Sequence, residues 1–235
     1  MAEPLTDKQL EALRGITSPT ISNAIETFDV RPRSEGFVDP SVRCMFPDLG
    51  GPDLGAMVGY AVTAKIAARE KPQTSLTYFD MFDAMAGVPK PWVVVIEDLD
   101  WPNPIGSYWG EVNGSIYKGM GCVGLVTNGG VRDLDEVEET GFHFFASCVL
   151  VSHAYVHLVE VGTPVTIGGL TVAPGDLLHG DKHGVVSIPQ DVAREVAAAS
   201  AEVERRERPI IDFARSSEMS ADGLRDLFSR ATETH

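Results

Sequence analysis

The fold is decided by two short apolar runs, "KPWVVVIED" at residues 90–98 and "CVGLVTN" at residues 122–128. Continuous apolar runs of this length are typical of strands that are buried on both faces of a sheet. The segment between them, "GEVNGSIYKGMG" at residues 110–121, has a helical pattern that Gly119 or Gly121 is expected to end. A strand, a helix and a second strand in this order predict a parallel βαβ unit.

Further elements of the same kinds flank this unit. A β-rich run at 56–68 and a helix at 75–88 come before it, and a short helix at 133–141 and a strand at 143–149 follow it. A short strand is expected around 42–46, in an otherwise irregular segment rich in Pro and Gly. We therefore predict an α/β fold in which a mixed, partly parallel sheet carries flanking helices.

The N-terminal part predicts two helices, and the second half of the chain predicts hairpins. Thr6 and Gln9 have the spacing of a capping box, and a second helix is expected with Ser18 as its cap and Pro19 in its first turn. Residues 156–189 contain short β segments broken by Gly-Gly and Pro-Gly. Such breaks favour hairpins, so the second half is expected to be β-rich.

The length of 235 residues suits one large domain with an extension. We assign residues 1–205 to a single α/β domain and residues 206–235 to a helical C-terminal tail. The net charge is −15, from 34 acidic and 19 basic residues, and so acidic a surface repels phosphate backbones. Nucleic acid is therefore not an expected partner, whereas a local basic pocket for a small anion is compatible with this charge.

The cysteines and the N-terminus predict a cytoplasmic protein. Cys44, Cys122 and Cys148 are odd in number and widely spaced, which argues against a disulfide framework or a cysteine-based zinc site. The N-terminus "MAEPLTDKQL" is polar and acidic, unlike a signal peptide. The apolar runs are too short to span a bilayer, so no membrane association is expected.

Two turns at the carboxyl ends of the predicted strands are the best candidates for a ligand site. The first leads into a helix near Gly110, and the second is "NGGVRDLDEV" at residues 128–137. In the second turn, Arg132 offers a planar donor fork for an anion, and Asp133 is a hard oxygen ligand for Mg²⁺ or Mn²⁺. On local sequence alone, however, Asp133 followed by Glu136 fits a capping box, and Arg132 could simply be solvated.

Two pairs of histidines have a spacing that can indicate zinc ligands. His153 and His157 are four residues apart, as are His179 and His183, and on a helix this spacing favours a metal pair. Both pairs lie in segments with β or turn character, where four residues span about 13 Å. The spacing therefore argues against a zinc site.

The residues around these turns resemble the RraA-like family, which includes 4-hydroxy-4-methyl-2-oxoglutarate aldolases. The mark of that family is a Gly-Asp pair, a gap of twenty residues and then Arg-Asp. Here Gly110–Glu111 is followed by twenty residues and then Arg132–Asp133. The resemblance covers roughly residues 15–200. It rests also on "WGEVNGSIYKGMGCVGLVTNGGVRDLDEVEETGF" (109–142), "PVTIGGLTVAPGDLLHGDKHGVVSIP" (164–189) and "SPTISNAIE" (18–26).

This resemblance implies a fold of the swivelling β/β/α type and a metal-dependent site. Asp133 would hold Mg²⁺ or Mn²⁺ directly, and Glu111 would act through a water. Arg132 would bind a 2-oxo acid and stabilise its enolate. Family members form trimers or hexamers whose active sites lie at subunit interfaces. The resemblance also places substrate-binding groups at the start of the helix, namely Gly110, Val112 and Asn113.

The expected function is a class II lyase that releases pyruvate from a 4-hydroxy-2-oxo dicarboxylate and that also decarboxylates oxaloacetate through the same enolate. The alternatives are a non-catalytic regulator that binds a ribonuclease, or a metal-dependent enzyme that acts on a sugar acid. The sequence departs from the family pattern at Glu111, which replaces an aspartate. It departs again at His179 and His183, which lie in a stretch that is commonly acidic in relatives. This second departure indicates either a different substrate or a neutral change on a turn.

Overall fold

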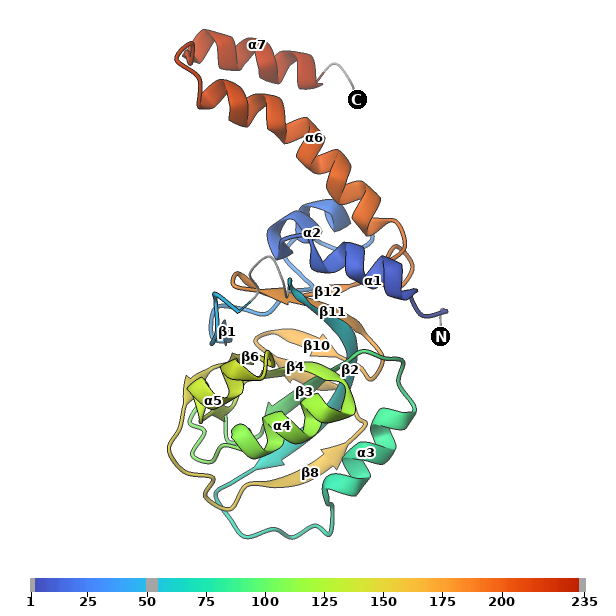
Figure 1. Cartoon of the computed structure of the whole chain (residues 1–235), viewed down its shortest axis with the longest axis vertical. Helices are drawn as coiled ribbons and strands as arrows, with labels where there is room; N and C mark the ends of the chain where they lie inside the picture. The colour runs from blue at the N-terminus through green and yellow to red at the C-terminus, as the bar shows by residue number, and fades with distance from the viewer. Residues whose placement is uncertain (1–2, 50–54, 233–235) are drawn as a thin grey trace.

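The computed structural model describes residues 3–49 and 55–232 (Figure 1). Its centre is an eight-stranded mixed sheet with the strand order β1-β6-β4-β3-β2-β11-β12, in which β8 pairs with β2. The four neighbouring strands in the middle of this order run parallel to one another, which confirms the predicted βαβ unit. These strands are β2 (Met57–Ala67), β3 (Trp92–Asp98), β4 (Cys122–Thr127) and β6 (His143–Ala146).

Both faces of the parallel strands are buried, which explains why their sequences are apolar without alternation. Val94 and Ile96 of β3 point into a core beneath the crossover helices, whereas Val93 and Val95 point into a second core on the opposite face. The helices over the first core are α3 (Tyr78–Ala86), α4 (Glu111–Met120) and α5 (Leu134–Glu139) (Figure 1). As predicted, α3 ends at Gly87, and of the two glycines expected to end α4 it is Gly121, at φ 103°, that does so.

The second half is β-rich, as predicted, and supplies the antiparallel strands. β11 and β12 form a hairpin that joins the main sheet through β2, whereas β9 and β10 form a separate hairpin over the second core. Their bounds are β8 (His157–Val161), β9 (Val165–Ile167), β10 (Leu170–Val172), β11 (Leu177–Asp181) and β12 (Gly184–Ile188).

Three short strands complete the sheets. The strand expected around 42–46 is β1 (Arg43–Cys44), which pairs with β6. The segment 143–149, expected to be one strand, is two strands, because the chain leaves the main sheet after β6. Its continuation, β7 (Cys148–Val149), pairs with β5 (Gly130–Val131) in a small sheet of two strands.

The N-terminal helices pack on one end of the main sheet, where α2 contacts β11 and β12 and α1 contacts β2. α1 (Asp7–Arg14) has the predicted capping box between Thr6 and Gln9. α2 (Ser18–Glu26) is capped by Thr17, so the prediction of Ser18 as the cap is wrong. The Ser18 hydroxyl is used elsewhere, in a 2.9 Å hydrogen bond with Nδ1 of the buried His179.

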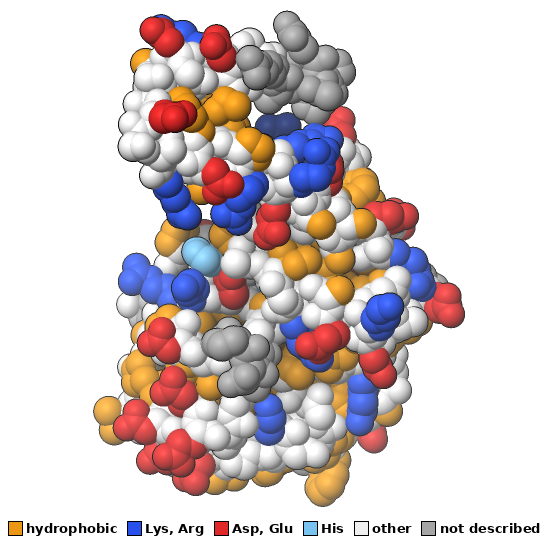
Figure 2. Space-filling view, turned by 45° about the horizontal axis from the view of Figure 1, so that its top comes forward, with side chains coloured by type: hydrophobic (Ala, Val, Ile, Leu, Met, Phe, Trp, Pro, Cys, Tyr) orange, Lys and Arg blue, Asp and Glu red, His pale blue; other side chains and the backbone are white. Residues whose placement is uncertain are grey.

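The C-terminal part consists of α6 (Val196–Ala214) and α7 (Ala221–Thr232), which extend away from the sheets as a pair (Figure 1). The predicted limit between the domain and the tail, at residue 205, falls inside α6. This limit stays a prediction. Within the described part of the chain, no helix is long and apolar enough to cross a membrane. Acidic and basic side chains are interspersed over the face shown in Figure 2.

His143 gives the folded state a testable pH dependence. Burial and then the nearby Lys118 lower the pKa of His143 to about 4, so this side chain is neutral in the folded protein at pH 5 to 7. The unfolded chain takes up a proton near the ordinary pKa of 6.5, so stability is lost as pH falls below that value. Between pH 7.5 and pH 5, we expect His143 to lower the free energy of unfolding by about 2 kcal/mol.

Urea denaturation of the wild type and of His143→Phe at these two pH values measures this contribution. Phe suits the site because the imidazole already stacks on Phe145. The variant should lose less stability on acidification than the wild type. An equal loss in the two proteins would show that His143 does not contribute.

Candidate functional site

The structure brings the two predicted turns together at the carboxyl ends of β3 and β4. Trp109, at the end of the first turn, bridges to Val131 of β5 as a parallel neighbour. The Arg132 amide then donates to the Trp109 carbonyl at 3.0 Å. As a result Gly110–Glu111 and Arg132–Asp133, which are twenty residues apart in sequence, are in direct contact.

Asp133 links the two turns through its carboxylate. Its Oδ2 accepts a 3.0 Å hydrogen bond from the Glu111 amide, the first N–H of α4. Gly110, at the N-cap position of α4, has no side chain with which to satisfy that amide. Asp133 therefore caps a helix that is distant in sequence, and its negative charge lies at the positive end of that helix.

The capping-box interpretation of Asp133 and Glu136 is wrong. Asp133 stands at the N-cap position of α5, yet its side chain forms no capping bond there. Its backbone lies in the left-handed region, at φ 53° and ψ 51°, unlike an ordinary N-cap residue. This conformation is uncommon for a residue other than glycine, although Asp and Asn adopt it more readily than most. It turns the carboxylate toward α4.

Gly110 is required by close packing. A Cβ at this position would collide with Oδ2 of Asp133 and would lie 3.0 Å from Cγ of Arg132. The backbone φ of Gly110 is −160°, which any residue adopts, so the requirement is for space rather than for conformation. The glycine thus lets the start of α4 approach the Arg132–Asp133 pair.

The Arg132 side chain is available to a ligand. Its Nε lies 3.6 Å from Oδ2 of Asp133, and the two side chains are 35% and 37% exposed. This loose pairing leaves the guanidinium fork accessible while it keeps a positive charge beside the carboxylate. Arg132 is therefore not merely solvated, because its side chain is also paired with Asp133.

The other predicted substrate-binding residues form the first turn of α4. Glu111 and Val112 have exposed side chains, and Val112 is 68% exposed. Asn113 is buried, and its Nδ2 donates to the Tyr108 carbonyl, which ties the turn closed. The amides of Val112 and Asn113 belong to the group of N–H donors that have no partner inside a helix.

These groups fit a hard cation that keeps several waters better than they fit zinc. Among residues 3–49 and 55–232, no three or more His, Cys, Asp or Glu side chains gather in a way that could hold a metal. Magnesium is commonly held by one or two carboxylates with waters in its other positions, and Asp133 and Glu111 provide such a pair. Zinc usually needs three or four convergent protein ligands.

The histidines have other partners. His179 is fully buried, with its ring nitrogens bonded to Ser18 and to the Leu13 carbonyl, and burial lowers its pKa. It lies in β11, so it is a core residue and not a substitution on a turn. His183 lies in the turn after β11 and bonds to Asp181. The rings of the remaining pair bond to nearby backbone carbonyls, His153 to that of Ala154 and His157 to that of Tyr155.

One acidic residue at the same edge of the sheet has no place in the sequence-based prediction. Asp98, the last residue of β3, is only 1% exposed, and its Oδ2 has no hydrogen-bond partner in the described structure. The signal in the sequence is an acidic residue at the end of a continuous apolar strand, followed by a turn. Its unpaired oxygen is visible only in three dimensions.

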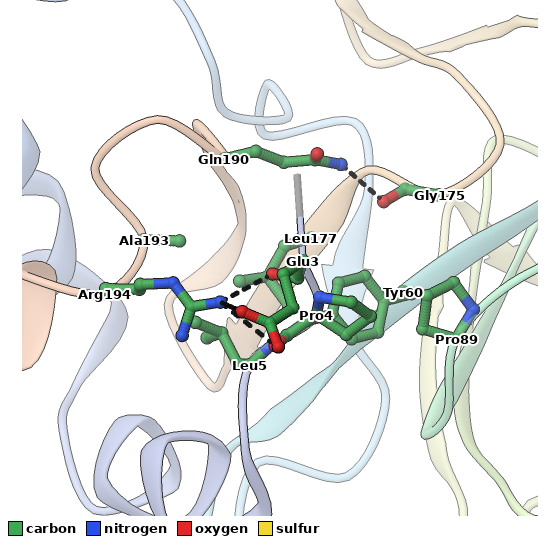
Figure 3. Close-up of a pocket in the computed structure, with 10 residues that line it drawn as sticks. All are labelled: Glu3, Pro4, Leu5, Tyr60, Pro89, Gly175, Leu177, Gln190, Ala193 and Arg194. Atoms are coloured by element: carbon green, nitrogen blue, oxygen red, sulfur yellow. Dashed lines mark hydrogen bonds and ion pairs between the residues drawn. The ribbon is translucent and has the colours of Figure 1, made fainter. Parts of the chain in front are cut away.

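A small cavity elsewhere in the molecule has a structural explanation. Its volume is about 30 Å³, and it lies between the N-terminal segment and the start of α6 (Figure 3). Arg194 donates to the Glu3 carbonyl at 2.9 Å, and the Leu5 amide donates to the Tyr60 hydroxyl at 2.7 Å. These bonds fasten the N-terminal segment to the body of the protein. The cavity is too small for a dicarboxylic acid.

Comparison with known proteins gives matches to a family model and to individual sequences. The family model described as RraA-like, Aldolase/RraA, matches residues 18–187. A protein of Halalkalibacterium halodurans named "Putative 4-hydroxy-4-methyl-2-oxoglutarate aldolase" is 30% identical over 100 residues, or 40% of this chain and 48% of that protein. The chain spans less than half the length of the first curated relatives it matches.

Solved structures share the fold. An uncharacterized protein from Pseudomonas syringae pv. tomato superposes with a TM-score of 0.72 at 23% identity, over 100% of this chain and 97% of that one. RraAS2 of Streptomyces coelicolor, described as an unusual member of the RNase ES inhibitor RraA protein family, gives 0.67 at 20% identity, over 88% and 98%. At these identities the similarity concerns the fold alone, and it confirms the predicted fold class.

Proposed function

Because the chain belongs to the RraA-like, Aldolase/RraA family, we propose that it is a divalent-metal-dependent lyase that releases pyruvate from a 4-hydroxy-2-oxo dicarboxylate. The observation that carries this proposal is the contact between the Asp133 carboxylate and the start of α4, beside an accessible Arg132. This contact combines a hard oxygen ligand, a planar cation and free helix N–H groups at one place. The carboxylate can bind the cation, whereas the guanidinium and the helix N–H groups can bind the anionic 2-oxo acid.

The proposed cation is Mg²⁺ or Mn²⁺, held directly by Asp133 and through a water by Glu111. When bound, it would supply Lewis-acid polarisation of the keto group. Oδ2 of Asp133 already accepts the Glu111 amide, so the carboxylate is oriented before any cation arrives. Its partial exposure leaves room for water ligands.

The residues of this chain have distinct parts in the proposed reaction. The amides of Val112 and Asn113 bind the substrate carboxylate at the start of α4. A water held by the Glu111 carboxylate accepts the proton of the 4-hydroxyl group, and C4 becomes a carbonyl as the bond between C3 and C4 breaks. The electron pair of that bond forms the C2–C3 double bond of an enolate, whose negative charge lies on the former keto oxygen. Arg132 stabilises the negative charge that develops on this oxygen. Protonation at C3 then gives pyruvate, and loss of CO₂ from oxaloacetate would pass through the same enolate.

We also propose that the protein forms a homotrimer or hexamer in which the active site lies at a subunit interface. Apolar side chains are exposed at the start of α4, where Val112 is 68% exposed, and at the end of β7 and just beyond it, where Val149 is 54% and Val151 96% exposed. Exposed apolar side chains grouped in this way are typical of an interaction surface. Light scattering of the purified protein measures its oligomeric state directly, and a monomer would contradict this part of the proposal.

Pyruvate release tests the proposed function. Purified protein is offered 4-hydroxy-4-methyl-2-oxoglutarate or oxaloacetate with Mg²⁺ or Mn²⁺, and pyruvate is detected with lactate dehydrogenase. We expect activity that a chelator abolishes and that Asp133→Asn lowers by at least about 100-fold, because the variant removes the ligand charge. Asn tolerates the left-handed backbone of this position, so the fold should persist. Turnover by Asp133→Asn equal to that of the wild type would contradict the proposed site.

A further inference from the structure

Asp98 lies under the turn that carries the site. Asp98 is the last residue of β3. Asn128 comes directly after β4, and its carboxamide binds the Asp98 backbone in the way that a residue of a neighbouring strand would. Oδ1 of Asn128 accepts from the Asp98 amide at 2.7 Å, and Nδ2 donates to the Asp98 carbonyl at 3.2 Å. Asp98 and the "NGG" turn are therefore held in a fixed relation.

The two oxygens of the Asp98 carboxyl group have different environments. Oδ1 accepts a 2.9 Å hydrogen bond from the Asp100 amide, whereas Oδ2 has no partner in the described structure. The side chain is almost completely buried. Burial is the main cause that raises the pKa of Asp98 to about 6, and the charges that face it are those of Asp100, which raises the pKa further, and Arg69, which lowers it.

The unpartnered oxygen faces Gly129. A Cβ on Gly129 would lie 2.7 Å from Oδ2 and 2.9 Å from Cβ of Asp98, so this turn can pack on Asp98 only with a glycine. From the other side, Gly129 is held by Ser147, whose Oγ donates to the Gly129 carbonyl at 2.9 Å. Gly129 is thus fixed between Asp98 and the segment that links β6 to β7.

The path from Gly129 to the site is short and constrained. Gly130 and Val131 form β5, which pairs with β7 on one side and contacts Trp109 on the other. The next residues are Arg132 and Asp133. A displacement of Gly129 would therefore be transmitted to both side chains, and errors of about 1 Å in a site can cost about 100-fold in rate.

We infer that Asp98 is a positioning residue of the proposed site, because its carboxyl group packs against Gly129 while Asn128 holds its backbone, and together these contacts fix the turn that presents Arg132 and Asp133. This inference rests on the proposed function, and it adds to it a residue outside the Gly-Glu and Arg-Asp pairs. Asp98 acts by its shape and by its buried hydrogen bond. An asparagine, which has the same shape, should therefore replace it.

The variants Asp98→Ala, Asp98→Asn and Gly129→Ala separate this role from general stability. At a temperature well below unfolding, we expect Asp98→Ala and Gly129→Ala each to lower kcat for pyruvate release by at least about 30-fold. Asp98→Asn should stay within about threefold of the wild type. Asp100→Asn, a neighbouring acid that bonds to Arg69 rather than to the turn, is the matched control and should leave kcat unchanged.

A second measurement keeps the inference testable without turnover. Mn²⁺ binding, followed by electron paramagnetic resonance, should weaken about tenfold in Asp98→Ala and Gly129→Ala but not in Asp98→Asn. If the wild type binds Mn²⁺ and releases no pyruvate, the proposed reaction is wrong and the Mn²⁺ measurement alone decides the role of Asp98. Folded Asp98→Ala with unchanged kcat and Mn²⁺ affinity would overturn the inference. So would a fully active Gly129→Ala, or an Asp98→Asn as impaired as Asp98→Ala.

Discussion

Arg132→Ala is expected to lower kcat/KM for pyruvate release by about 10²–10³-fold, the loss that follows removal of one donor to a developing oxyanion. The guanidinium is more than one-third exposed and its pairing with Asp133 is loose, so its removal should cost little stability. Steady-state kinetics with saturating Mg²⁺, combined with thermal unfolding of both proteins, measures the two effects separately.

Arg14→Ala is the matched control for this experiment. The Arg14 side chain is 29% exposed and also contacts a carboxylate, that of Glu11 at 2.9 Å, but it ends α1, outside the proposed site. It should behave as the wild type in turnover. A folded Arg132→Ala protein that retains full activity would show that Arg132 does not stabilise the enolate, whereas one that is unfolded by circular dichroism would show that Arg132 is needed for the fold.

Gly110→Ala is expected to abolish most activity by a purely steric effect. The added methyl group would collide with Oδ2 of Asp133, so either the carboxylate or the start of α4 must move. Loss of the hydrogen bond between Asp133 and the Glu111 amide follows, and a displacement of this size should cost about 100-fold or more in turnover. Mn²⁺ affinity should fall with it, since the displaced group is the proposed ligand.

Gly119→Ala controls for the change of glycine to alanine in the same helix. A Cβ on Gly119 would meet nothing within 4 Å. The substitution should therefore keep full activity and stabilise the helix by about 0.5–1 kcal/mol. If Gly110→Ala binds Mn²⁺ and turns over substrate as well as Gly119→Ala, close approach of the two turns is not needed for function.

The elements that the sequence predicts well are those that depend on local pattern. The run at 90–98 is apolar on both faces because β3 lies between two cores, so its burial can be inferred from the amino-acid sequence alone. The capping box of Thr6 and Gln9 is likewise complete within four residues. The pairing of the two turns is also predictable in outline, because consecutive parallel strands end at the same edge of a sheet.

The errors concern side chains whose partners lie far away in sequence. Ser18 has the composition of a helix cap, but its hydroxyl bonds to His179, 161 residues further on. Asp133 has the composition of a cap for α5, but its carboxylate caps α4. In both cases the local sequence matches a helix cap, but the side chain forms a tertiary hydrogen bond instead of the local capping bond. Asp98 cannot be identified from the sequence, because its distinguishing property is a buried oxygen without a partner among the described residues, and that property depends on the tertiary structure.

The left-handed backbone of Asp133 has an evolutionary consequence. Few side chains adopt this conformation at low cost, and asparagine, which has nearly the shape of aspartate but carries no charge, is one of them. A single conservative replacement can therefore remove the charge of the site while the sheet, the helices and the close approach at Gly110 persist. In the proposed lyase, one such replacement would separate binding from catalysis without a change of fold.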